Sequence, residues 1–193
     1  SGVLAVRQPN GGSPKVEAMP WASGAYDMLG VDDERVLLGA DHHLLLVERG
    51  NMRKLSEELV YPRLFKRSQF HPERIYVGTE AGLRLVIVDE SRLTLLPPLQ
   101  TELSMLITSI AETSVDEVWV GTARHGLWRY RLSSDGRVVG TQRFGDREGL
   151  PLGPIAAVDV QTLDDGRLLA STPKGLFGFD GKRFSAATVD GLA

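Results

Sequence analysis

Residues 107–130 decide the fold, and they read ITSIAETSVDEVWVGTARHGLWRY. This stretch contains an apolar run that ends in Gly-Thr, a short polar segment, and a second apolar run that opens with Gly-Leu. The same arrangement occurs at 74–86. It occurs with related residues at 35–47, where Gly-Ala and His-Leu replace Gly-Thr and Gly-Leu, and at 167–179, where Ser-Thr replaces Gly-Thr. The equivalent positions Gly39, Gly78, Gly121 and Ser171 lie 39, 43 and 50 residues apart, which is close to the repeat length of β-propeller blades.

Each repeat divides into strand-sized pieces of four to eight residues, rich in β-branched and aromatic side chains and separated by Gly, Asp, Ser and Pro. Around Trp119 the expected strands are 107–112, 117–121, 127–132 and 138–144. The inner ones are almost continuously apolar, as expected for strands covered on both faces. The glycine before the third strand is expected to close a tight hairpin, where a positive φ favours glycine.

The sequence therefore predicts an all-β chain, namely a β-propeller of four-stranded antiparallel blades. We expect blades at about 22–60, 61–100, 101–150 and 151–193, and a partial blade at 1–21 that supplies only its last two strands. Four blades and half a blade form an incomplete ring. Such a ring is expected to belong to a longer one, or to self-associate through its open edges.

Composition narrows the classes of partner. The 193 residues carry 22 basic and 25 acidic side chains, for a formal charge of −3, which gives no electrostatic footprint for nucleic acid or anionic lipid. No apolar stretch approaches the length of a membrane-spanning helix, so this segment is expected to make no membrane contact. Cysteine is absent, which excludes disulfides and thiolate metal sites.

Binding residues are expected on the loops at one face of the blades, where the second-to-third strand hairpins and the connections between blades lie. The candidate ligand-binding residues are Asp41, His42, Glu80, Arg124, His125, Arg147, Glu148 and Lys174. The cationic pair Arg124-His125 is the strongest of these, because a carboxylate or another anion is able to dock there. Each is equally explained as an ordinary polar turn residue.

Neither a metal nor a cofactor site is expected. Adjacent residues in a strand point to opposite faces, so His42 and His43 are not expected to chelate one ion. The sequence has no nucleophile elbow, zinc-protease motif, phosphate-binding loop or dinucleotide fingerprint. The carboxylate pairs Asp32-Asp33 and Asp164-Asp165 are explained by turns. We therefore expect a protein that is not an enzyme and has no catalytic residues.

The third repeat resembles the two-component regulator propeller family. The residues that carry the resemblance are 107–112, Val118-Trp119-Val120-Gly121-Thr122 and 126–130, and Gly149-Leu150-Pro151 followed by 155–158 resembles the family's lead into the next first strand. The match is good over about 101–180, and over 25–100 it rests on the Gly-Thr and Gly-Leu skeleton alone. The tryptophan of the pattern is Leu37, Tyr76 and Leu169 in the other repeats.

This resemblance implies a periplasmic sensor segment of an inner-membrane signalling protein, which binds a small molecule, glycan or protein and relays to a kinase or cyclase output. One alternative is a scaffold propeller that binds other proteins. A third is a propeller-fold lyase or glycosidase, since fold alone does not settle function.

Overall fold

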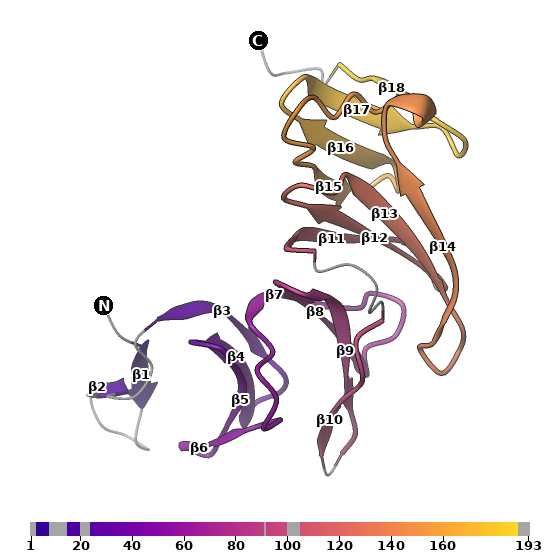
Figure 1. The fold of residues 1–193 in the computed structure, drawn as a ribbon. Coiled ribbons are helices and arrows are strands. Elements are labelled where there is room, and N and C mark those ends of the chain that lie inside the picture. Colours follow the sequence, from indigo (N-terminus) through magenta and orange to yellow (C-terminus); the bar gives the residue numbers. More distant parts are fainter. Residues whose placement is uncertain (1–2, 8–14, 20–23, 91, 100–104, 189–193) are drawn as a thin grey trace.

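The computed structural model describes residues 3–7, 15–19, 24–90, 92–99 and 105–188. These residues form four four-stranded antiparallel sheets and one two-stranded hairpin (Figure 1), and the regular structure outside the strands is a single 3₁₀ turn, η1 (Asp146–Glu148). No helix within the described part of the chain is long and apolar enough to cross a membrane. The predicted all-β class is confirmed.

Every sheet is built from four consecutive strands paired in chain order, so each is one propeller blade, with strands A to D. Blade 1 comprises β3 (Ala25–Gly30), β4 (Arg35–Ala40), β5 (His43–Glu48) and β6 (Asn51–Lys54). Blade 2 comprises β7 (Pro62–Arg67), β8 (Arg74–Thr79), β9 (Gly82–Val88) and β10 (Leu93–Leu95). Blade 3 comprises β11 (Ile107–Ser114), β12 (Glu117–Thr122), β13 (Leu127–Leu132) and β14 (Val138–Phe144). Blade 4 comprises β15 (Asp159–Thr162), β16 (Leu168–Thr172), β17 (Gly175–Phe179) and β18 (Phe184–Ala186).

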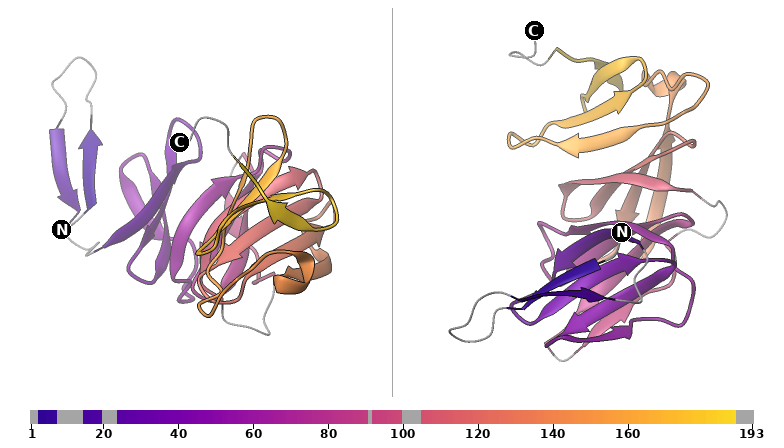
Figure 2. Two further views of the ribbon diagram at one scale, coloured as in Figure 1. Left: turned by 90° about the horizontal axis from the view of Figure 1, so that it is seen from above. Right: turned by 90° about the vertical axis from the view of Figure 1, so that its left-hand side faces the viewer.

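The blades follow one another along an arc, with the A strands on its inner side and the D strands on its outer side (Figure 1). Figure 2 shows the same succession from two further directions, with each sheet facing the next. The hairpin of β1 (Val3–Arg7) and β2 (Lys15–Met19) lies beyond blade 1. The expected partial blade at 1–21 is described only at these two strands.

The repeated Gly-Thr and Gly-Leu pairs build the hairpin between strands B and C. In blade 3 the Thr122 hydroxyl donates to the Gly126 carbonyl at 2.7 Å and accepts from the His125 amide at 2.8 Å, and Thr79 makes the same two kinds of bond in blade 2. Gly126 has φ +79°, as predicted for a residue that closes this turn. In blade 1 the left-handed position is taken by Asp41, with φ +52°.

The cores lie between blades, since each sheet buries its faces against its neighbours. Between blades 3 and 4, Trp119 is fully buried and its ring packs 4.8 Å from Phe144 and 4.9 Å from Phe179. At the inner end of this seam Gly121 packs against Val158 and Ser109 so closely that a Cβ would overlap both. The tryptophan and glycine of the third repeat therefore close the contact with the next blade.

The segment that leads into the first strand of blade 4 is bonded to blade 3. β15 starts at Asp159, directly after residues 155–158. Ala156 adopts φ +53°, and its carbonyl accepts from the Gly126 amide at 3.0 Å. The segment is therefore bonded to the hairpin of blade 3 before it enters the sheet of blade 4.

Candidate functional site

The eight predicted binding residues all lie on the face formed by the B–C hairpins and the D–A connections, here called the loop face. Asp41, His42, Glu80, Arg124, His125 and Lys174 belong to the hairpins, and Arg147 and Glu148 belong to η1 in the connection from blade 3 to blade 4. None of the eight lines the three cavities described below.

Several of these residues instead make contacts within the protein. His42 stacks on Tyr61 with ring centroids 4.5 Å apart, and Glu80 pairs with Arg63. The Glu148 carboxylate accepts from the Gly145 amide at 2.9 Å. These contacts give the residues structural roles, and ligand binding by any of the eight stays a prediction.

The two residues of the strongest predicted pair, Arg124-His125, have different surroundings. Arg124 is exposed, whereas His125 is half-buried and its carbonyl accepts from Trp128 Nε1 at 3.1 Å and from Arg143 Nε at 3.0 Å. His125 Nδ1 is buried and has no hydrogen-bond partner. The pair therefore presents one exposed side chain, that of Arg124.

Besides a cavity of about 610 Å³ lined by residues 96–99 and 135–138, three cavities open on or beside the opposite face, which is formed by the A–B and C–D turns and is here called the turn face. The first, the seam cavity, has about 540 Å³ and lies between blades 3 and 4. Its polar lining comes from the end of β11, the start of β12, β13 and the A–B turn of blade 4, namely Thr113, Ser114, Glu117, Arg129, Asp165 and Arg167. Leu168 and Phe179 supply its apolar floor.

Glu117 organises the seam cavity. Its carboxylate accepts from Trp119 Nε1 at 3.2 Å and from the Thr113 hydroxyl at 3.1 Å, and it lies 3.6 Å from the guanidinium of Arg129. Arg129 also lies over the Trp119 ring, 5.3 Å from its centroid. The side chain of Glu117 keeps 17% of its area exposed, so this carboxylate is held in place and still reaches the cavity.

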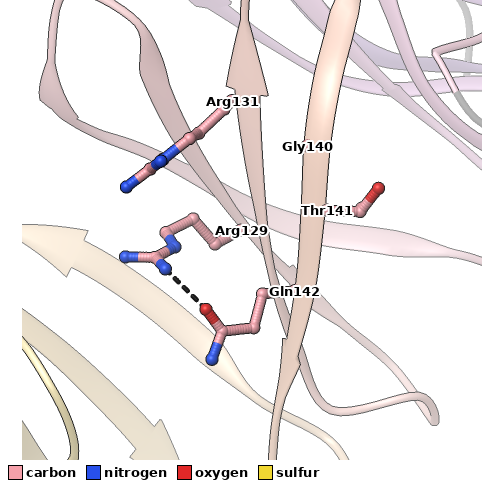
Figure 3. A pocket seen from close by; sticks show the side chains of 5 residues that line it. All are labelled: Arg129, Arg131, Gly140, Thr141 and Gln142. Atoms are coloured by element: carbon pink, nitrogen blue, oxygen red, sulfur yellow. Dashed lines mark hydrogen bonds between the residues drawn. The ribbon is translucent and has the colours of Figure 1, made fainter.

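The second cavity, here the strand cavity, has about 210 Å³ and adjoins the first through the shared residue Arg129. Arg129, Arg131, Gly140, Thr141 and Gln142 line it, all from β13 and β14. Figure 3 shows Arg129, Arg131 and Gln142 pointing to the same side, and Thr141 pointing away. Arg129 donates to Gln142 Oε1 at 2.5 Å.

The third, the inner cavity, has about 500 Å³ and shares Thr113 and Gly166 with the seam cavity. Its inner wall holds Lys66, which donates to the Ile110 carbonyl at 3.1 Å. Burial lowers the pKa of Lys66 below its usual value, and the nearby Glu112 carboxylate partly opposes this shift. Phe70 lies at the rim with 41% of its area exposed.

Glu112 closes the contact between blades 2 and 3. It is 1% exposed and accepts from the Ser68 hydroxyl at 2.6 Å, the Gln69 amide at 2.8 Å and the Tyr76 hydroxyl at 2.9 Å. Burial, reinforced by the Glu112 charge, raises the pKa of Tyr76. Both carboxylate oxygens are engaged within the protein, so Glu112 is a poor group for binding a ligand.

The sequence reasoning missed Glu117, Arg129 and Arg131 because they lie in strands, and it explained Asp165 as a turn residue. The sequence did indicate the two arginines, because β13 carries Arg129 and Arg131 whereas the third strands of the other blades are mostly apolar. Alternation would have placed both on one face with Trp119. Within the described ranges no three His, Asp or Glu side chains gather closely enough to hold a metal ion.

Comparison with family models and with curated protein sequences finds no match. Solved structures match well. Two are extracellular domains described as belonging to hybrid two-component systems of B. thetaiotaomicron, with 18% and 20% identity, TM-scores of 0.64 for both, and coverage of 91% and 96% of this chain. A third is the β-propeller domain of Cps50 (Swd1) from Myceliophteria thermophila, with 11% identity, a TM-score of 0.56, and coverage of 98% of this chain and 64% of that one.

The chain has the β-propeller fold. It spans 23% and 27% of the two bacterial domains, so it corresponds to about a quarter of each. At such identities the likeness establishes the fold of the chain alone.

Proposed function

We propose that this chain is a segment of an extracytoplasmic, ligand-sensing β-propeller of a bacterial signal-transduction protein, of the two-component regulator propeller type. We further propose that it is not an enzyme, that it binds a small molecule or a glycan, and that a kinase or cyclase in the longer protein receives the signal. The structural likeness to extracellular domains of hybrid two-component systems supports this role.

The observation that carries the proposal is the polar seam cavity between blades 3 and 4. A ligand in it touches Glu117 and Arg129 of blade 3 together with Asp165 and Arg167 of blade 4. It therefore favours one relative placement of the two blades over others, and a ligand shifts a conformational equilibrium only through such a difference in affinity. A ligand bound only to a hairpin tip of one blade would not favour one relative placement of the two blades in this way.

A thermal-shift screen of the chain against small molecules and oligosaccharides tests this function. A compound that binds only the folded protein raises its melting temperature. We expect Arg167→Gln, in the seam cavity, to reduce that rise, and Lys174→Gln, on the loop face, to leave it unchanged. Both side chains are exposed, so neither change should disturb folding. If Lys174→Gln alone abolished the rise, the ligand would bind the loop face, as the sequence predicted.

A protein-binding scaffold is the second candidate, and the outer edge of blade 3 favours it. The reading frame around the chain separates the two functions. A membrane-spanning segment followed by a kinase or cyclase supports the sensor, and the absence of both contradicts it.

A further inference from the structure

The outer strand of blade 3 differs from the other three outer strands in length. β14 has seven residues, whereas β6 has four and β10 and β18 have three each. β14 ends its sheet, so one backbone edge has no neighbouring strand among the described residues, and Figure 1 shows it along the outside of the arc. Proteins usually protect such edges by keeping them short or by placing proline or several charges on them.

β14 lacks most of that protection. Its sequence VVGTQRF contains no proline and no acidic residue, and Val139 is 68% exposed. The outer edge of a blade faces away from the neighbouring blades, so further blades in a longer ring would leave it open. A long open strand of this kind is the template for strand addition by another chain.

The charge beside this edge selects the partner. The strand cavity is lined by two arginines and an amide, and no carboxylate lines it. The nearest acid, Glu117, lies 3.6 Å from Arg129 and 4.0 Å from Arg131, so one carboxylate serves two guanidinium groups. Arg131 keeps 59% of its side chain exposed. The site therefore has spare hydrogen-bond donors and spare positive charge.

Gly140 leaves room for an incoming side chain. It pairs with Arg131 across the β13–β14 ladder, and a Cβ at position 140 would only touch the Arg131 stem, at 3.7 and 3.9 Å. The backbone there has no positive φ that demands glycine. A side chain on an added strand opposite Gly140 starts two strand spacings, about 10 Å, from Arg131. The long Arg131 side chain can span this distance over Gly140, which has no side chain of its own to block it.

We propose that the free edge of β14 binds an extended acidic peptide segment of another protein as a fifth strand of blade 3, with one of its carboxylates seated between Arg131, Arg129 and Gln142. Main-chain hydrogen bonds along β14 hold the segment, and the paired guanidinium groups select its acidic side chain. The site adjoins the seam cavity through Arg129, but its defining residues Arg131 and Gly140 line only the strand cavity, so variants at these two positions test it apart from the sensed ligand.

A fluorescein-labelled peptide, Thr-Val-Glu-Val-Glu-Val-Thr, tests the proposal by fluorescence anisotropy with the full chain. We expect the matched peptide with Gln in place of Glu to bind about tenfold more weakly, because it lacks the charge-assisted bonds. A version N-methylated at alternate residues should lose binding, because it has no amides to donate to the edge. Amide NMR shifts should concentrate in β14.

Three variants complete the test. Arg131→Gln should weaken the acidic peptide about tenfold and leave the Gln peptide unaffected. Gly140→Val should fill the strand cavity and block the acidic peptide, while melting at or above the wild-type temperature, because valine favours strands. Arg137→Gln, in the adjoining turn and paired with Asp135, is the control and should change nothing.

Several results would overturn the proposal. Equal binding of the N-methylated peptide excludes strand addition, and equal losses in Arg131→Gln and Arg137→Gln show unspecific attraction between charges. Absence of binding by the acidic peptide contradicts the proposal outright. Dimerisation of the chain that Gly140→Val abolishes would assign the edge to a second copy instead.

Discussion

Blade 3 carries two carboxylates on opposite faces, and their surroundings differ completely. Glu112 faces blade 2, is fully buried, and accepts hydrogen bonds from Ser68, Gln69 and Tyr76. Glu117 faces blade 4, contacts Trp119 and Arg129, and borders an open cavity. Between blades 2 and 3, the Glu112 carboxylate is hydrogen-bonded within the protein and joins the two blades. Between blades 3 and 4, polar groups beside Glu117 remain accessible at the cavity.

This difference indicates which side of blade 3 offers hydrogen-bonding groups to a ligand. A buried carboxylate with every oxygen engaged is stabilising only while all its partners remain, and it has nothing to offer a ligand. A carboxylate that positions arginines beside a cavity adds less to stability and leaves donors available. Of these two carboxylates, Glu112 therefore anchors blade 3, although it also borders the inner cavity, and Glu117 is the one that leaves arginine donors available to a ligand.

The largest expected effect is the loss of Glu112. Glu112→Ala leaves the Ser68 hydroxyl, the Tyr76 hydroxyl and the Gln69 amide without their acceptor, and should lower the free energy of unfolding by about 3 kcal/mol. Glu117→Ala should cost about 1 kcal/mol, because Trp119 Nε1 keeps its 2.9 Å bond to the Thr113 hydroxyl. Urea denaturation of both variants measures the difference, and equal losses would erase the contrast between the seams.

An intermediate effect is expected from Tyr76, which donates to Glu112 from blade 2. Tyr76→Phe and Glu112→Gln should be non-additive, with a coupling energy of about 1 kcal/mol, because both remove the same hydrogen bond. A double-mutant cycle by chemical denaturation gives this value. Additive losses would mean that the hydroxyl and the carboxylate act independently.

The smallest effect concerns Lys66. The pKa of Lys66 is lower in the folded protein than in the unfolded chain, where it is about 10.4. In the pH window between the two pKa values, the unfolded chain therefore binds more protons than the folded protein does. The contribution of Lys66 to stability should therefore rise as pH increases through this window. Lys66→Met should remove that part of the slope just below the unfolded pKa, as measured by thermal denaturation, whereas an unchanged slope would show that Lys66 is not desolvated.

Much of the fold was predictable because each blade repeats local chemistry. The strands around Trp119 and the glycine hairpins follow from apolar runs and positive φ, which are properties of short segments. The bond that ties the segment before β15 to blade 3 was not predictable from Ile155 or Val158, because it joins the Ala156 carbonyl to the amide of Gly126, which is distant in sequence.

The cavities were less accessible to sequence reasoning. Glu117, Arg129 and Arg167 meet only because two blades pack face to face, and nothing local relates residue 129 to residue 167. Loop residues such as Arg124 and Lys174 attracted attention because polar turns are conspicuous. Charged residues inside strands, such as Arg129 and Arg131, indicate a binding site more strongly than turn residues do. Burying a charge is unfavourable, so a charged side chain in a mostly apolar strand needs a specific reason.

The most direct test uses the first compound that raises the melting temperature of the wild-type chain. Its effect should be measured on Glu112→Gln and on Glu117→Gln, two identical chemical changes on opposite faces of one blade. We predict that Glu112→Gln melts at a lower temperature yet keeps the ligand-induced rise, and that Glu117→Gln melts near the wild-type temperature and loses the rise. The reverse pattern would contradict the assignment of the ligand to the seam between blades 3 and 4.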